Sequence, residues 1–105
     1  MESILDNQFE SKVIENKNIS IVIFAANWNG SSQFIEDHIH EISEQNNDRV
    51  SVFKMDIESN NNIANKYWLH RFPTTLFFKN GELVELIVGV YSKTRANRII
   101  SNLLT

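Results

Sequence analysis

The fold of this chain is decided by residues 19–32, which read Ile19-Ser20-Ile21-Val22-Ile23-Phe24-Ala25-Ala26-Asn27-Trp28-Asn29-Gly30-Ser31-Ser32. Residues 19–26 form a nearly continuous β-branched and aromatic run, which is typical of a central strand buried on both faces. Beyond the following loop, mostly apolar side chains recur at the spacing of one helical face: Phe34, Ile35, His38, Ile39 and Ile42. The stretch therefore predicts a strand, a loop and a helix that runs to about Gln45, with Ser31 or Ser32 as the helix N-cap.

Similar patterns predict the other elements on both sides of this stretch. Upstream, apolar residues at helical spacing predict a helix that is capped by Asp6 or Asn7 and ends near Lys17. Downstream, the patterns predict a strand at 50–57, a short helix at 61–67, strands at 75–78 and 83–88, and an amphipathic helix at 96–104. Asn80-Gly81 lies between the last two apolar runs, and this dipeptide is a strong signal of a β-hairpin.

The order of the predicted elements, α-β-α-β-α-β-β-α, indicates the fold class. Strands joined through helices are expected to be parallel, whereas the two hairpin strands are antiparallel. We predict one α/β domain over residues 1–105 with three α/β/α layers, in which a mixed sheet of four or five strands has helices on both faces. A length of 105 residues, of which 42% are hydrophobic and 22% charged, fits one such domain.

Composition excludes several classes of function. The net charge of −3 and the absence of a basic run argue against general binding of nucleic acid or anionic lipid. Met1 leads into acidic residues instead of a secretory signal, and the longest apolar stretch, 21–26, is too short to span a membrane. We therefore expect a soluble, cytoplasmic protein. The chain has no cysteine, which excludes disulfides and thiolate metal sites equally.

Four landmarks, which agree in order and spacing, make nearly the whole chain resemble the thioredoxin family. The first predicted strand runs into Trp28-Asn29-Gly30-Ser31-Ser32, where the family has Trp-Cys-Gly-Pro-Cys. The other landmarks are Lys54-Met55-Asp56-Ile57-Glu58 as the following strand, Phe72-Pro73-Thr74 as the cis-proline loop, and Phe78-Lys79-Asn80-Gly81-Glu82 with Gly89 as the terminal hairpin. The resemblance implies a thioredoxin-like fold with a cis peptide bond between Phe72 and Pro73.

The departures from the family pattern argue against redox chemistry. Asn29 and Ser32 stand where the resemblance places the nucleophilic and resolving cysteines. Neither an amide nor an unassisted hydroxyl can replace a thiolate. Ile23 stands at the position of the family's buried acid, so Lys54, which would pair with that acid, is expected to turn its ammonium outward. The sequence therefore predicts a thioredoxin-like protein without thiol–disulfide exchange.

Other reactive sites have simpler explanations. Ser32 would need a general base to act as a nucleophile, and His38 lies nearly two helical turns away, so Ser31 or Ser32 is better explained as a helix cap. His38 and His40 are two residues apart on the predicted helix and point to different faces, and no third ligand lies at metal-binding spacing. Asp56 and Glu58 are interpreted as a solvated strand end. We expect no catalytic residue, no metal and no cofactor.

A recognition surface is expected beside Pro73. In the family, the backbone amide and carbonyl of the residue before this proline are free to pair with an extended peptide in a shallow apolar groove. The resemblance places the following residues along that groove: Trp28, Gly30, Ser31, Arg71, Phe72, Pro73, Val90 and Tyr91, with Trp68 nearby. Aromatic side chains beside an arginine are the composition of an interaction hot spot. We predict a redox-inactive module that binds a protein or an extended peptide.

Two alternatives for this surface stay open. The aromatic residues could serve packing alone, with Trp28 covering the motif loop and Trp68 lying beneath the last turn of its helix. Alternatively, the same surface could join two copies of the chain into a homodimer.

A third alternative is an ordinary thiol-disulfide oxidoreductase in which Asn29 and Ser32 are engineered replacements of cysteines. Ile23, Ser31 and Asp37 argue against this alternative, because they also depart from the family pattern. An engineered replacement of the cysteines would leave their surroundings unchanged.

Overall fold

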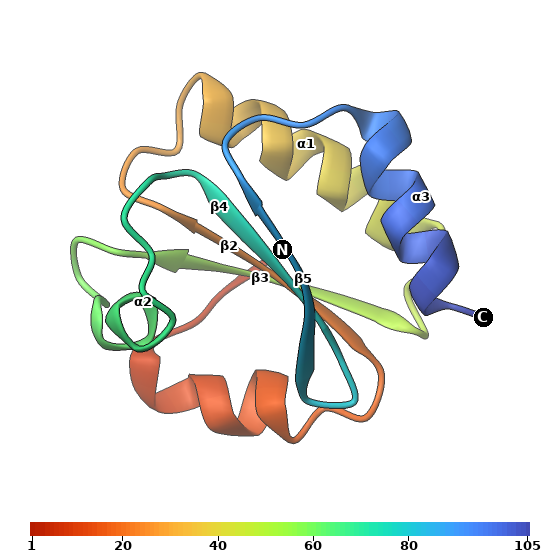
Figure 1. The fold of residues 1–105 in the computed structure, drawn as a ribbon, viewed down its shortest axis with the longest axis horizontal. Helices are drawn as coiled ribbons and strands as arrows, with labels where there is room; N and C mark the ends of the chain where they lie inside the picture. The colour runs from red at the N-terminus through yellow and green to blue at the C-terminus, as the bar shows by residue number, and fades with distance from the viewer.

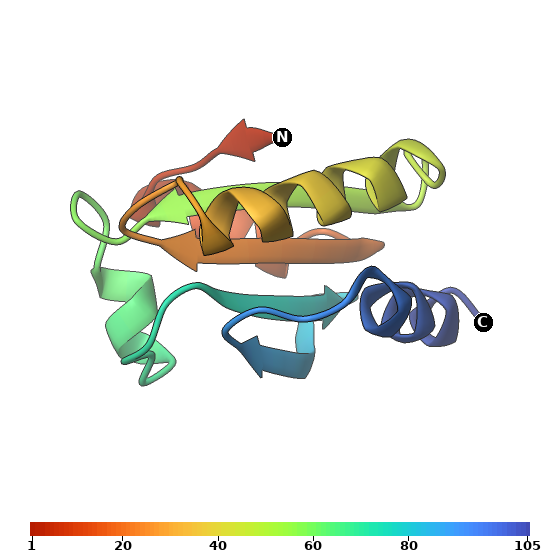
Figure 2. The same ribbon diagram turned by 90° about the horizontal axis from the view of Figure 1, so that it is seen from above.

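The computed structural model describes all of residues 1–105, and a five-stranded mixed sheet forms its middle layer (Figure 1). The strands are β1 (Glu2–Ser3), β2 (Ile19–Ala25), β3 (Val50–Asp56), β4 (Thr74–Lys79) and β5 (Glu82–Val88). They lie in the order β1-β3-β2-β4-β5, which Figure 2 shows from above. β2 is parallel to β3 and antiparallel to β4. The predicted mixed sheet is confirmed, and its fifth strand is the two-residue β1.

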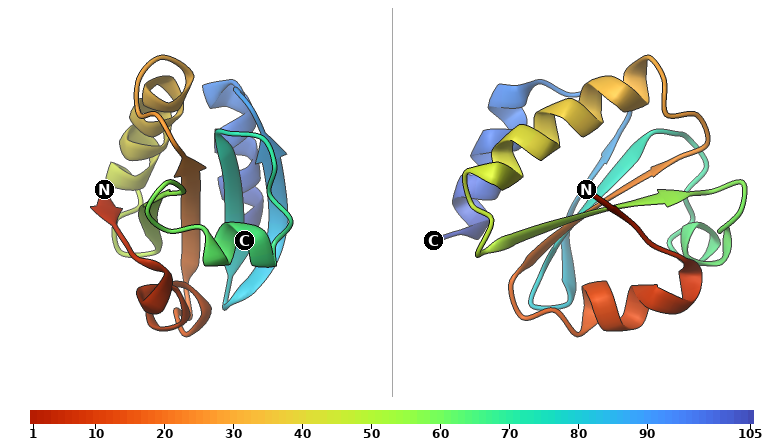
Figure 3. Two further views of the ribbon diagram at one scale, coloured as in Figure 1. Left: turned by 90° about the vertical axis from the view of Figure 1, so that its left-hand side faces the viewer. Right: turned by 180° about the vertical axis from the view of Figure 1, so that it is seen from behind.

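Helices cover both faces of the sheet. Helices α1 (Ser31–Glu44) and α3 (Lys93–Leu103) pack on one face, whereas α2 (Asn62–Lys66) and the N-terminal helical segment pack on the other (Figure 3). The three-layer α/β/α arrangement predicted from the sequence is therefore present. None of these helices combines the length and the apolar character that crossing a membrane requires.

The central strand is apolar at every position except Ser20, because both of its faces are covered. All seven residues of β2 are buried. Ile19, Ile21 and Ile23 join the cluster beneath α1 and α3. Val22 and Phe24 join the cluster on the opposite face. Alternate side chains of a strand point to opposite faces, so a strand inside a covered sheet is apolar at nearly every position. Ser20 is the exception in β2, and its buried hydroxyl has no hydrogen-bond partner.

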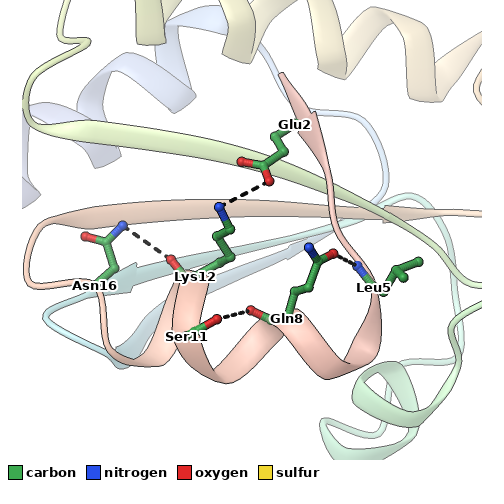
Figure 4. Close-up of polar contacts among 6 residues, drawn as sticks. All are labelled: Glu2, Leu5, Gln8, Ser11, Lys12 and Asn16. Carbon is green, nitrogen blue, oxygen red and sulfur yellow. Dashed lines mark hydrogen bonds and ion pairs between the residues drawn. The ribbon is translucent and has the colours of Figure 1, made fainter.

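The N-terminal segment differs from the predicted regular helix. It consists of a 3-10 turn (Asp6–Gln8) and a π-helical turn (Glu10–Ile14). Short-range polar contacts shape it: Gln8 Oε1 accepts from the Leu5 amide at 2.8 Å, and Ser11 Oγ donates to the Gln8 carbonyl at 3.3 Å (Figure 4). Such local side-chain bonds compete with the regular helical ladder.

Asp6 caps a different helix from the one predicted. Its carboxylate accepts from the backbone amides of Asn62 at 3.1 Å and Ile63 at 3.2 Å. These amides belong to the first turn of α2, where backbone N–H groups have no partner inside the helix. The acidic side chain therefore ties the N-terminal segment to α2 across 56 residues of sequence.

The β4–β5 hairpin and the last helix agree with the sequence patterns. Asn80 and Gly81 form its two-residue turn with φ values of 52° and 80°, the combination that a type I′ turn requires. A Cβ atom on Gly81 would lie 2.2 Å from the carbonyl oxygen of Ile14, so glycine is also required by close packing. The N-cap of α3 is Ser92, whose hydroxyl accepts from the Arg95 amide at 3.1 Å.

Candidate functional site

The loop between β2 and α1 lies at the carboxyl end of the central strand. Asn29 is exposed, and its backbone amide donates to Asn27 Oδ1 at 3.0 Å. Gly30 reverses the chain with φ at 54°, and Ser31 and Ser32 are already the first helical residues. The prediction that a serine caps α1 is wrong, because the cap position belongs to Gly30 and no side chain accepts a bond there.

Ser32 has no base with which to act as a nucleophile. Its side chain is 5% exposed, and no hydrogen bond joins its hydroxyl to a histidine or a carboxylate. His38 instead packs edge-on against Phe34 with 4.2 Å between ring centroids, and its Nε2 is buried without a partner. His40 lies 3.3 Å from Glu44 on an exposed part of the helix. No group of three potential metal ligands converges here or elsewhere.

Lys54 is paired, contrary to the prediction that its ammonium turns outward. Its Nζ lies 2.9 Å from Glu36 Oε1, and the two side chains are only 26% and 17% exposed. The same ammonium lies 4.9 Å from the ring centroid of Trp28, close enough for a cation–π contact. Ile23 is the register partner of Lys54 on β2 and supplies no acid. The carboxylate that neutralises Lys54 comes instead from helix α1.

Sequence reasoning missed Glu36 because its partner lies 18 residues away. One signal was available: position 36 follows the core residue Ile35 and so borders the buried stripe of α1. A carboxylate at such a border can reach across to the neighbouring strand, but only the packing of α1 shows which cation it meets.

The Pro73 segment lies at the same end of the sheet as this loop, because Phe24 near the end of β2 pairs with Thr74 at the start of β4. The Phe72–Pro73 peptide bond is cis. Phe72 precedes β4, and its backbone amide and carbonyl form no hydrogen bond within the chain. The Pro73 carbonyl, in contrast, accepts from the Gly89 amide at 2.8 Å, which ties this segment to the end of β5. The side chain of Phe72 packs against the core cluster on the α2 face of the sheet, which we call the α2-side cluster, whereas Trp28 packs against the cluster beneath α1 and α3.

The structure brings most of the predicted groove residues to one end of the sheet, but not all of them reach the surface. Val90 is 53% exposed, and Trp28 and Phe72 are half-buried. Pro73 is buried. The remaining exposed members of the predicted set are Gly30, Ser31 and Arg71.

Tyr91 was expected to line the groove, and this prediction is wrong. The residue is 4% exposed, and its hydroxyl donates to Thr75 Oγ1 at 3.0 Å. Its ring packs edge-on against Phe77 inside the core. Burial raises the pKa of the Tyr91 phenol well above its ordinary value. Tyr91 therefore supports this end of the sheet from beneath and cannot contact a partner.

Trp68 also departs from the sequence interpretation. It does not lie beneath α2, because 80% of its surface is exposed. It forms one wall of a pocket of about 350 Å³, whose other lining residues are Tyr67, Leu69, His70, Arg71, Thr74, Leu86 and Val88. No sequence pattern pointed to this pocket, because its two walls, 67–74 and 86–88, belong to different elements.

The fold and the site together define a thioredoxin-fold α/β protein in which the loop after the central strand contains no thiol. The thioredoxin family model matches residues 1–102. Thioredoxin 1 of Synechococcus elongatus is 32% identical over 92 residues, which cover 88% of this chain and 86% of that protein.

Two rickettsial proteins are similarly close. The thioredoxin of Rickettsia felis is 34% identical over 91 residues, with 87% of each chain covered. That of Rickettsia bellii is 33% identical over 100 residues, with 95% of each chain covered. The chain belongs to the thioredoxin family.

Proposed function

We propose that this protein is a redox-inactive member of the thioredoxin family that binds an extended segment of another protein. The binding site is the surface formed by Trp28, Gly30, Ser31, Arg71, Phe72 and Val90, which we call the Trp28–Phe72 surface. The observation that carries the proposal is that the amide and carbonyl of Phe72 have no partner within the chain, beside a loop that retains Trp28 but has no thiol.

The chemistry of the loop supports recognition without reaction. Thiol–disulfide exchange requires a thiolate whose pKa is near ambient pH, and the amide of Asn29 has no comparable ionisable proton. The hydroxyl of Ser32 has no base beside it, and Ile23 supplies no group that could transfer a proton. A segment placed on this surface therefore meets no nucleophile.

The geometry of the Trp28–Phe72 surface supports binding of an extended segment. An unpaired backbone amide and carbonyl on one residue can pair with a strand in the manner of β-strand addition. Trp28 and Val90 supply further apolar surface, and the ammonium of Lys54, which is paired with Glu36, lies against the Trp28 ring. A ring held in place loses little conformational entropy on binding, which favours affinity.

The absence of redox activity is tested by insulin reduction with dithiothreitol. We expect the protein to produce no rate above that of dithiothreitol alone, with a dithiol thioredoxin as the positive control. A clear acceleration would contradict the proposal.

Binding at the surface is tested by affinity capture from an extract of the native cell. A Trp28→Ala/Phe72→Ala double variant should lose the captured partner, whereas Leu5→Ala should retain it. Leu5 is 53% exposed and lies outside the surface, so it is a matched control for the loss of exposed apolar area. Near-ultraviolet circular dichroism and urea unfolding check that each variant is folded. Retention of the partner by the folded double variant would place the interface elsewhere.

A further inference from the structure

The backbone of Trp68 has an unusual conformation at the end of α2. The helix ends at Lys66 with Tyr67 as its C-cap, and Trp68 follows with φ at 59°. The Trp68 amide donates to the Asn65 carbonyl at 3.0 Å, and the Leu69 amide donates to the Ala64 carbonyl at 2.9 Å. These two bonds form a Schellman motif, in which the left-handed residue is usually glycine. A bulky side chain at this position is disfavoured by its contact with the backbone.

Folding does not account for a tryptophan at this position. Its side chain gains little from burial, because 80% of the residue is exposed. Glycine would satisfy the same two hydrogen bonds without steric cost. Residues held in disfavoured backbone conformations concentrate at functional sites, so the outlier points to a role for the exposed indole ring.

The indole ring faces an uncovered part of the sheet. Leu86 and Val88 form the opposite wall of the pocket and are 37% and 50% exposed. Leu86 is the register partner of Leu76, and Val88 that of Thr74. Register partners share a face of the sheet. Leu76 belongs to the α2-side cluster, so Leu86 lies on the face of the sheet that α2 covers. Together with Tyr67 and Leu69, Trp68 and the opposite wall give the pocket a lining of two aromatic and three aliphatic residues, which suits an apolar side chain of a partner.

Positive charge borders the apolar pocket. Arg71 lines it, and the ammonium of Lys66 lies 6.0 Å from the ring centroid of Tyr67. No aspartate or glutamate lines the pocket, and neither Lys66 nor Arg71 takes part in an ion pair of the chain. The whole chain has a net charge of −3, so this is a local basic patch on an acidic protein. Its charge is complementary to a carboxylate on a partner.

We propose that this cavity, the Trp68 pocket, binds a partner protein through a segment in which an apolar side chain adjoins an acidic residue. The apolar side chain enters between Trp68, Leu86 and Val88. The carboxylate pairs with the guanidinium of Arg71, which can hold it through two parallel hydrogen bonds. Tryptophan and arginine are the residue types that dominate interface hot spots. The Trp68 pocket shares Arg71 with the Trp28–Phe72 surface but does not require that surface to bind.

The test uses a synthetic probe, the acetylated peptide amide Gly-Phe-Asp-Leu-Glu-Gly, titrated into the ¹⁵N-labelled protein. We expect saturable shifts in the Trp68 indole resonance and in the backbone amides of 67–71 and 86–88. The matched amide peptide, Gly-Phe-Asn-Leu-Gln-Gly, should bind about tenfold more weakly, which is the size expected for one charge-assisted contact. Equal affinity for the two peptides, or shifts confined to other residues, would overturn the proposal.

Three variants separate the pocket from the fold. Trp68→Gly keeps the backbone geometry of the Schellman motif, so it should resist urea at least as well as the parent chain but bind the probe about tenfold more weakly. Arg71→Gln should remove the preference for the acidic peptide. Leu5→Ala, which removes exposed apolar surface far from the pocket in sequence, should leave probe binding unchanged. Probe binding unchanged in a folded Trp68→Gly variant would refute the assignment.

Further measurements distinguish this site from the proposed function. The Trp28→Ala/Phe72→Ala variant should still bind the probe at the Trp68 pocket, so either site can fail without the other. Sedimentation of the protein alone identifies self-association. Concentration-dependent dimerisation that perturbs Trp68 and is abolished by Trp68→Gly would show that a second copy of the chain occupies the pocket, and would overturn the partner proposed here.

Discussion

The ion pair between Glu36 and Lys54 should couple helix α1 to strand β3 by a measurable free energy. The perturbation is a double-mutant cycle of Glu36→Gln, Lys54→Met and the combined variant. The cycle isolates the interaction between the two side chains from the separate effects of each substitution. The pair is chosen because its atoms are 2.9 Å apart and its side chains are 26% and 17% exposed.

The magnitude follows from distance and exposure. At this separation, two unit charges attract by about 6 kcal/mol at an effective dielectric constant near 20. Desolvation of both groups offsets much of this attraction. Exposed pairs couple by about 0.2–1 kcal/mol, and removal of one partner from a fully buried pair costs about 3–5 kcal/mol. For a pair of intermediate exposure, we expect a coupling of about 1–2 kcal/mol.

The combined variant should lose less free energy of unfolding than the sum of the losses of the two single variants. Glu36→Gln leaves the Lys54 ammonium beside Ile23 and Trp28 without its carboxylate. Lys54→Met leaves a largely buried carboxylate without a cation. The combined variant contains neither charge and so avoids both penalties.

The assay is urea unfolding of the four proteins, followed by far-ultraviolet circular dichroism at low and high salt. The exposed pair between Lys93 and Glu41 is the matched control, and its cycle should give a smaller coupling that falls further with salt. Tryptophan fluorescence should also change in Lys54→Met, because the ammonium lies against the Trp28 ring. A coupling below about 0.3 kcal/mol, or one as salt-sensitive as the control, would refute the reasoning.

Two further substitutions test the packing. Gly81→Ala should lower the free energy of unfolding by more than about 1–2 kcal/mol, because the new methyl group meets the Ile14 carbonyl oxygen at 2.2 Å and φ is 80°. The control is Asn80→Gly, which should leave the stability unchanged. A Gly81→Ala protein as stable as the parent chain would contradict the turn geometry. The free energy of unfolding should be unchanged below pH 10 and fall above it. Burial raises the pKa of Tyr91 above its ordinary value of 10.0, so above pH 10 the unfolded chain releases a proton that the folded chain retains. The free energy of unfolding should fall by at most about 1.4 kcal/mol per pH unit. Urea midpoints measured between pH 9 and pH 12 should show a smaller fall in Tyr91→Phe. An identical fall in both proteins would exclude Tyr91 as the cause.

Much of the fold could be predicted because the pattern of apolar residues within each segment indicates which of its faces is buried. The nearly continuous apolar run of β2, the alternating pattern of β3 and the Asn80-Gly81 turn each correspond to one element of the structure. The N-terminal helix could not be predicted correctly, because the helical spacing of Phe9 and Val13 does not distinguish a regular helix from consecutive 3-10 and π turns. Asp6 supplied a valid capping signal, but its hydrogen bonds go to α2.

The candidate site could be predicted only in part. The positions of Trp28, Arg71, Phe72 and Val90 at one end of the sheet followed from the order of the landmarks. Tyr91 was misplaced, because a tyrosine can either present its ring to solvent or bury it when the hydroxyl finds a partner, and Thr75 lies on another strand.

By itself, the sequence determined the order of the elements and the chemistry that this chain lacks, since a missing cysteine needs no structure to be recognised. Only the tertiary structure decided which distant side chains meet: Glu36 with Lys54, and Trp68 with the open face of β5. The physical reason is that periodicity specifies which face of an element is buried, whereas the partner on that face depends on how the elements pack. The same packing leaves a basic, aromatic pocket open at the end of α2 in a thioredoxin-family chain that has no thiol.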